Sequence, residues 1–192
     1  GVIHRGILCR RGLAIWIHFW KYRNIEVMYH KNYFFHHKFL IMLQEEKLVT
    51  VLSDLVKINN DRIEGYKKAK AASDDADVKA LFQHMIDDSV KYVAELNQQL
   101  LAQGAEAETD TTTSGKLYRT WMAVKTTFTG TDRYSLFSSC EYGEDAVQRA
   151  YADALSSDTA MPYSVRELIA NQQANLKEAH DTIKSYRDVV SH

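Results

Sequence analysis

The residues best placed to do chemistry lie in the segment 138–155, which is rich in small residues and carries four acids. These acids are Glu141, Glu144, Asp145 and Asp153. A helix turns about 100° per residue, so an apolar stripe is predicted along this segment, with Glu144 inside its edge. The members of that stripe are Leu136, Cys140, Val147, Tyr151 and Ala154. A carboxylate on a buried stripe needs a partner, which can be a metal ion or a hydrogen-bonding group such as Gln173, Asn59 or a tyrosine hydroxyl.

A metal is one candidate partner, because carboxylates and imidazoles from neighbouring helices can converge inside a bundle. The weak candidates for metal ligands are Glu144, His180 and Asp88. Each also has a structural interpretation, since a histidine at the edge of a helix and a hydrogen-bonded acid are both common. Which interpretation holds depends on where the predicted helices place these residues relative to one another.

Apolar residues at steps of three and four predict four long helices, over about 43–72, 76–103, 133–157 and 163–190. The sequence SDD at 73–75 ends the first helix and caps the second, Gly104 ends the second, and Pro162 begins the fourth. The short turn between the first two helices makes them antiparallel neighbours. The connection from Ala105 to Asp132 is far longer than a hairpin needs, and it contains a shorter predicted helix over 116–128.

Such a long connection can run the length of the bundle, so the predicted fold is all-α, with ferritin-like topology and one long crossover. When the helices are placed side by side according to their connections, four polar residues fall at about the same level along the bundle axis. They are Asn59, Ser89, Glu144 and Gln173. We expect these residues to form a hydrogen-bonded layer that fixes the register of the helices, since buried polar groups are normally paired.

A complete di-iron site would also need a Glu-x-x-His element on each of two helices. The residue three before His180 is Lys177 rather than a glutamate, and both Glu64 and His84 fall away from the apolar stripes. We therefore predict no bound cofactor, and keep iron or another divalent metal as the alternative.

Residues 1–41 differ from the rest of the chain. They contain nine of the 21 aromatic residues and have seven Lys/Arg against Glu26 alone, a net charge of +6. They show no sustained periodicity, and the apolar run 12–20 ends at Lys21, so it is too short to span a membrane. We expect 1–41 to be an unstructured or incorrectly assigned extension and 42–192 to be the bundle. Association of 1–41 with a membrane surface is the alternative.

Composition bounds the function. The 192 residues include one proline and eight glycines, which suits long helices in one domain. The chain carries a net charge of −1, so residues 42–192 carry −7 and offer no basic surface for nucleic acid. Cys9 and Cys140 are far apart and have no metal-type spacing, which favours a reducing compartment.

Four separated motifs make the chain recognisable. They are NNDRIEGY at 59–66, GKLYRTW at 115–121, CEYGED at 140–145 and HDTIK at 180–184. Together they resemble a bacterial, ferritin-like four-helix-bundle family known as a domain of unknown function, the 2383 family. The resemblance covers about 48–190 and implies a bundle fold and a bacterial, cytoplasmic setting. It implies no reaction and no ligand set.

We therefore expect a non-enzymatic bundle protein with a role in stress adaptation or assembly. No nucleophile–base pair or phosphate-binding loop is present in the sequence to suggest catalysis. The alternative is a degenerate metal or small-ligand site built around Glu144 and its neighbours. Self-association as a homo-oligomer is compatible with either function.

Overall fold

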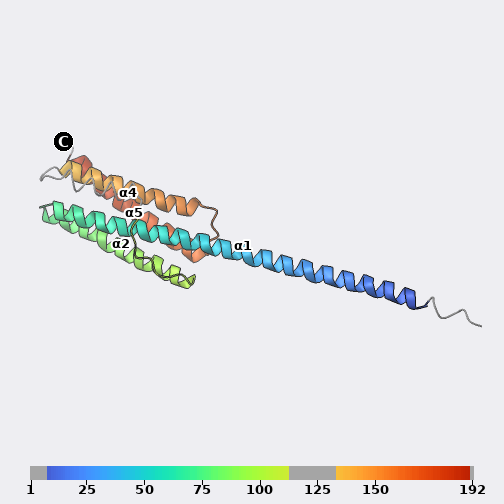
Figure 1. Cartoon of the computed structure of the whole chain (residues 1–192). Helices are drawn as coiled ribbons and strands as arrows, with labels where there is room; N and C mark the ends of the chain where they lie inside the picture. The colour runs from blue at the N-terminus through green and yellow to red at the C-terminus, as the bar shows by residue number, and fades with distance from the viewer. Residues whose placement is uncertain (1–7, 113–132, 191–192) are drawn as a thin grey trace, which may run out of the picture. The chain divides into compact units, whose positions relative to one another are not determined.

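The computed structural model describes residues 8–112 and 133–190, with side chains described from His37 onward. Helices are the only regular elements in these two ranges, as Figure 1 shows. They are α1 (Leu8–Ala72), α2 (Ala76–Ala102), α4 (Arg133–Ser156) and α5 (Tyr163–Val189). The predicted all-α bundle of four helices is confirmed. The short helix predicted over 116–128 lies outside the described residues.

The chain divides into two units, Gly1–Gln44 and Glu45–His192. The expectation that 1–41 lacks regular structure is wrong from Leu8 onward, because α1 begins there. No proline occurs in α1 and no glycine lies between Gly12 and Gly65, so nothing in the local sequence breaks the helix. Among the side chains described, from His37 onward, burial begins at Leu48, and residues 39–43 are 38–51% exposed. Among the described residues, none of the helices combines the length and apolarity that crossing a membrane requires.

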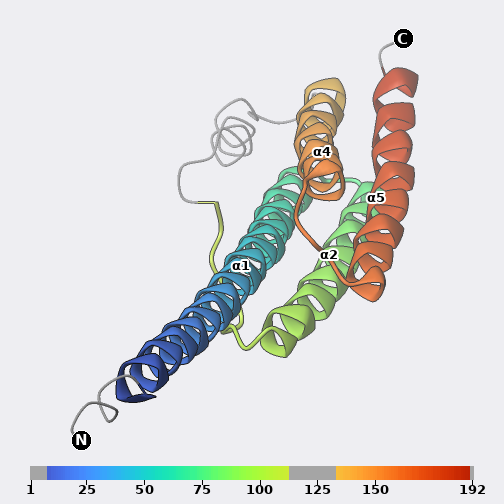
Figure 2. The same cartoon turned by 90° about the vertical axis from the view of Figure 1, so that its right-hand side faces the viewer.

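The second unit contains the core, to which all four helices contribute. Figure 2 shows α4 and α5 side by side. Aromatic rings contact one another in this core. The ring centroid of Phe82 lies 5.4 Å from that of Tyr66 and 5.9 Å from that of Phe137. Aliphatic side chains that are at most 1% exposed fill the rest, namely Leu52, Leu55, Val56, Leu96, Leu100, Ile169, Leu176 and Ile183.

The turns follow the sequence signals. Ser73 Oγ accepts a hydrogen bond from the backbone N–H of Asp75 at 3.2 Å, which holds the tight turn between α1 and α2. Gly104 has φ +76°, a left-handed conformation that favours glycine. Beyond it, the backbone N–H of Ala105 donates to the carbonyl of Leu100 at 3.1 Å, which closes α2 in the manner of a Schellman motif.

The residues that follow α2, 105–112, are fastened to α1 by side chains. Glu108 accepts a hydrogen bond from Ser53 at 2.6 Å and an ion pair from Lys57 at 3.1 Å. Farther along, Asp61 accepts hydrogen bonds from the hydroxyl and the backbone N–H of Thr112. We call residues 105–112 the strap. Through these contacts the strap lies along α1 from Ser53 to Asp61.

Candidate functional site

The centre of the bundle holds an ion pair between Arg62 of α1 and Glu144 of α4. Both side chains are 0% exposed. The Nε of Arg62 lies 2.8 Å from Glu144 Oε1, and its Nη2 lies 2.7 Å from the same oxygen. An ion pair this deeply buried is stable only when the remaining polar atoms of both groups find partners.

The guanidinium of Arg62 meets that condition fully. Its Nη1 donates to the carbonyl oxygen of Met85 at 2.8 Å and to Ser89 Oγ at 2.7 Å, both on α2. Its Nη2 also lies 3.3 Å from the sulfur of Met85, and its plane stands 5.0 Å from the ring centroid of Tyr66. An arginine has five N–H donors, so every one of them has an acceptor here.

The carboxylate of Glu144 is bound unevenly. Its Oε1 accepts hydrogen bonds from Arg62 and from the hydroxyl of Tyr66. Its Oε2 is buried and has no hydrogen-bond donor among the described residues. The negative charge is therefore neutralised from one side, by a cation that comes from the chain itself.

The pair changes the acidity of its neighbours. Burial and the charge of Glu144 raise the pKa of the Tyr66 hydroxyl well above its ordinary value, so Tyr66 stays protonated and keeps donating. Burial is the largest single effect on Arg62 and lowers the pKa of its guanidinium, but the charge of Glu144 and the smaller contributions that follow it, including the hydrogen bond to Glu144, together raise that pKa above its ordinary value. Burial, followed by the same negative charge, raises the pKa of the Cys140 thiol, which makes that cysteine a poor nucleophile.

A second interior network joins all four helices, including α5, which the first network does not reach. Asn59 Nδ2 on α1 donates to the hydroxyl of Tyr151 on α4 at 2.8 Å, and that hydroxyl donates to Gln172 Oε1 on α5 at 2.8 Å. Gln172 Nε2 in turn donates to Glu95 on α2 at 2.9 Å. Each link fixes the depth of one helix against the next, because a shift by one residue would break it.

The structure thus buries three of the four residues predicted for the polar layer, and distributes them over two networks. Ser89 and Glu144 meet at Arg62, whereas Asn59 joins Tyr151. The fourth residue is a correction: Gln172 is buried in place of Gln173, which is partly exposed. Both glutamines lie three or four residues from Ile169 and from Leu176, so helical periodicity does not separate them.

The other two candidates for metal ligands lie apart from Glu144 in their contacts. Asp88 faces His84 one turn earlier on α2, at 3.6 Å. His180 contacts Asp145 and Asp181. Within residues 37–112 and 133–190, no three His, Cys, Asp or Glu side chains are grouped so that they could hold a metal ion.

Arg62 is the residue that the sequence analysis missed. It lies seven residues after Leu55 and seven before Ala69, both buried, so its spacing places it on the core stripe of α1. A charged residue is usually assigned to a solvated face. The available signal was that Arg62 lies on the buried stripe of α1, where its positive charge could neutralise the buried carboxylate of Glu144.

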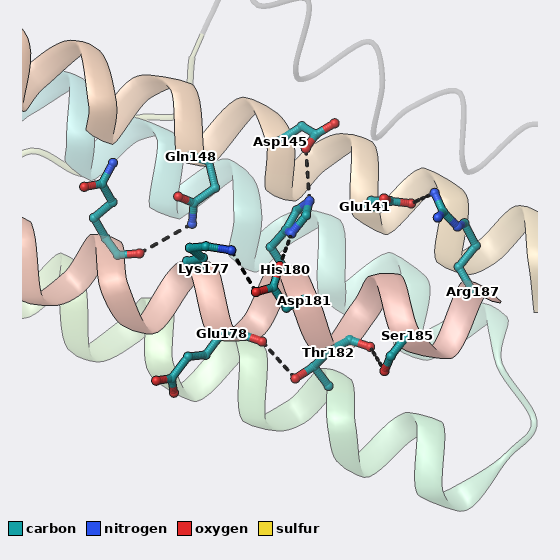
Figure 3. A network of polar contacts seen from close by, with 11 residues as sticks. Glu141, Asp145, Gln148, Lys177, Glu178, His180, Asp181, Thr182, Ser185 and Arg187 are labelled. Atoms are coloured by element: carbon teal, nitrogen blue, oxygen red, sulfur yellow. Dashed lines mark hydrogen bonds and ion pairs between the residues drawn. The ribbon is translucent and has the colours of Figure 1, made fainter. Parts of the chain in front are cut away.

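A third polar network, at the edge of the bundle, links α4 to α5 (Figure 3). His180 bridges Asp145 of α4 and Asp181 of its own helix, and Arg187 pairs with Glu141. Gln148 Nε2 reaches the backbone carbonyl of Gln173 at 3.5 Å. These contacts are partly exposed and follow the length of the α4–α5 pair.

A family model described as "Domain of unknown function (DUF2383)" matches residues 47–157, which is more than half of the chain. The matched range contains both partners of the central pair, Arg62 and Glu144. Among curated proteins, no match is found.

Proposed function

Since the chain belongs to the family described as Domain of unknown function (DUF2383), we propose that it is a non-enzymatic bundle protein with a metal-independent core. We propose further that it serves in the cytoplasm of a bacterium, in assembly or in stress adaptation. The observation that carries the proposal is the central pair: Glu144 is fully buried and takes its positive partner from Arg62.

The chemistry of this pair disfavours a metal. A guanidinium fixed within hydrogen-bond distance of the carboxylate repels any second cation there, and that repulsion is strong away from bulk water. Metal-ligand carboxylates in bundles of this topology are joined by other carboxylates and imidazoles. Glu144 is joined instead by an arginine, a tyrosine hydroxyl and, through the arginine, a serine.

Reactive side chains in the interior also support a non-enzymatic role. The thiol of Cys140 is fully buried and its pKa is raised, which disfavours the thiolate needed for attack. Burial is also the main cause of the raised pKa values of the Tyr66 and Tyr151 hydroxyls. Both hydroxyls are engaged in hydrogen bonds. Such groups hold protons rather than transfer them.

The direct test is the metal content of protein purified without chelator, followed by oxygen uptake after addition of ferrous iron. We expect no stoichiometric metal and no uptake above the rate of buffer alone. One or more equivalents of iron per chain, together with catalytic oxygen consumption, would contradict the proposal.

One observation favours the alternative function, a small-ligand or divalent-metal site at Glu144. Its Oε2 is buried without a donor among the described residues, so a ligand could bind there. The substitution Glu144→Gln separates the two functions. Both functions predict a lower melting temperature for this variant, because Arg62 loses its counter-charge. Only a ligand site predicts that stoichiometric binding of a metal or small ligand is present in the wild type and lost in the variant.

A further inference from the structure

His180 occupies a distinctive position between two carboxylates. Its Nε2 lies 3.1 Å from Asp145 Oδ1 on α4, and its Nδ1 lies 3.0 Å from Asp181 Oδ1 on α5. Figure 3 shows the imidazole between the two acids. The His180 side chain is 17% exposed, so it is largely shielded while its partners reach solvent.

The protonation state of the imidazole decides how many of these contacts it can make. An ionised carboxylate has acceptors and no donor, whereas a neutral imidazole has one N–H and one lone pair. Neutral His180 can therefore donate to Asp145 or to Asp181, and its other nitrogen then faces an oxygen with like partial charge. Only the imidazolium can donate to both.

The surrounding charges make Asp145 the partner that depends on His180. Lys177 also donates to Asp181 at 2.8 Å, and hydrogen bonds from Lys177 and then His180 hold the pKa of Asp181 below its ordinary value. In the described part of the chain, the only cationic group in contact with Asp145 is His180.

Several other ionisable groups near this interface have partners of their own. On α4 and α5, Glu141 pairs with Arg187. Two residues of α2 that face α5 are hydrogen-bonded to it: Glu95 to Gln172, and Tyr92 to Asn175. On the side of α4 that faces α1, Glu144 accepts hydrogen bonds from Arg62 and Tyr66.

We propose that His180 is a pH-dependent fastener that joins α5 to α4 more tightly when its ring is protonated. An imidazole ordinarily titrates near pH 6.5, within the range that a cell can reach under acid stress. The imidazolium makes both contacts, to Asp145 and to Asp181, whereas the neutral ring donates to only one of them. This inference concerns the edge of the bundle, so it stands whether or not the central pair excludes metal.

The test compares thermal melts of the full chain at pH 5.5 and pH 7.5 with those of His180→Gln. Glutamine keeps a donor to Asp145 but does not titrate. We expect the melting temperature of the wild type, taken relative to the variant, to be about 1–3 °C higher at pH 5.5 than at pH 7.5, as for a partly exposed ion pair.

Two further variants keep the result specific. His84→Gln removes a histidine that is 71% exposed and 3.6 Å from Asp88, and it should keep the pH dependence of the wild type. Asp145→Asn should remove the dependence as His180→Gln does. The proposal is overturned if His180→Gln shows the same pH dependence as the wild type, or if His84→Gln loses as much of it as His180→Gln.

Discussion

Tyr151 illustrates how much the interior depends on single polar atoms. Its hydroxyl accepts from Asn59 and donates to Gln172, so one oxygen connects α1, α4 and α5. The hydroxyl is needed because the amide groups on either side are both buried. A buried amide that loses its partner keeps the cost of desolvation without the compensating bond.

Tyr151→Phe should therefore lower the free energy of unfolding by about 1–3 kcal/mol. The measurement is urea denaturation followed by circular dichroism at pH 7. Tyr163→Phe is the matched control, since Tyr163 is 80% exposed, and it should change the stability by less than about 0.5 kcal/mol. Equal stability of Tyr151→Phe and the control would show that the hydroxyl does not hold the network.

At the scale of elements, the strap shows how a long connection is held in place. Hydrogen bonds from Ser53 and from the backbone N–H of Asp110 lower the pKa of Glu108 to about 2. The side chain of Asn97 on α2 makes two hydrogen bonds to the backbone of Glu108. Its Oδ1 accepts from the Glu108 N–H at 2.7 Å, and its Nδ2 donates to the Glu108 carbonyl at 3.0 Å. Glu108 therefore ties the strap to both α1 and α2.

The lowered pKa gives the strap a pH dependence of known sign. The carboxylate contributes stability above its ordinary titration range near pH 4.3, and this contribution is lost as pH falls toward 2. The difference in melting temperature between the wild type and Glu108→Gln should be largest at pH 7 and should shrink between pH 4.5 and pH 2.5.

Glu106→Gln, which alters an exposed acid of the same strap, is the control for this series. Its melting temperature should follow that of the wild type at every pH. A difference between the wild type and Glu108→Gln that stays constant down to pH 2.5 would contradict the assignment.

The helices themselves were predictable because their signals are local. The turn at Ser73, the left-handed Gly104 and the break before Pro162 each act within a few residues, and the bounds of α2, α4 and α5 follow them closely. The N-terminal part of α1 was not predictable from amphipathic pattern. That pattern reports burial, and the described side chains before Leu48 are exposed.

At the scale of the whole molecule, the site was only partly predictable. Burial of Asn59, Ser89 and Glu144 follows from their positions on apolar stripes. Their partners do not, because a partner is set by how far each helix slides and rotates against the others. The choice of Gln172 over Gln173, and the reach of Arg62 from α1 to both α2 and α4, depend on that arrangement.

The central pair links these scales, since Arg62 joins three helices through one fully buried charge. Removing one member of such a pair leaves an uncompensated charge in the core, which typically costs about 3–5 kcal/mol. Removing both members in favour of apolar side chains of similar volume is far less costly. If the two residues form a structural pair, the double variant loses less unfolding free energy than either single variant. If they act independently, the two losses add.

The most direct test is a double-mutant cycle on Arg62→Met and Glu144→Leu, with free energies of unfolding from urea denaturation. We predict that each single variant loses about 3–5 kcal/mol and that the double variant loses less than either one. Losses that simply add, so that the double variant is the least stable of the three, would contradict the claim that Arg62 is the structural counter-ion of Glu144.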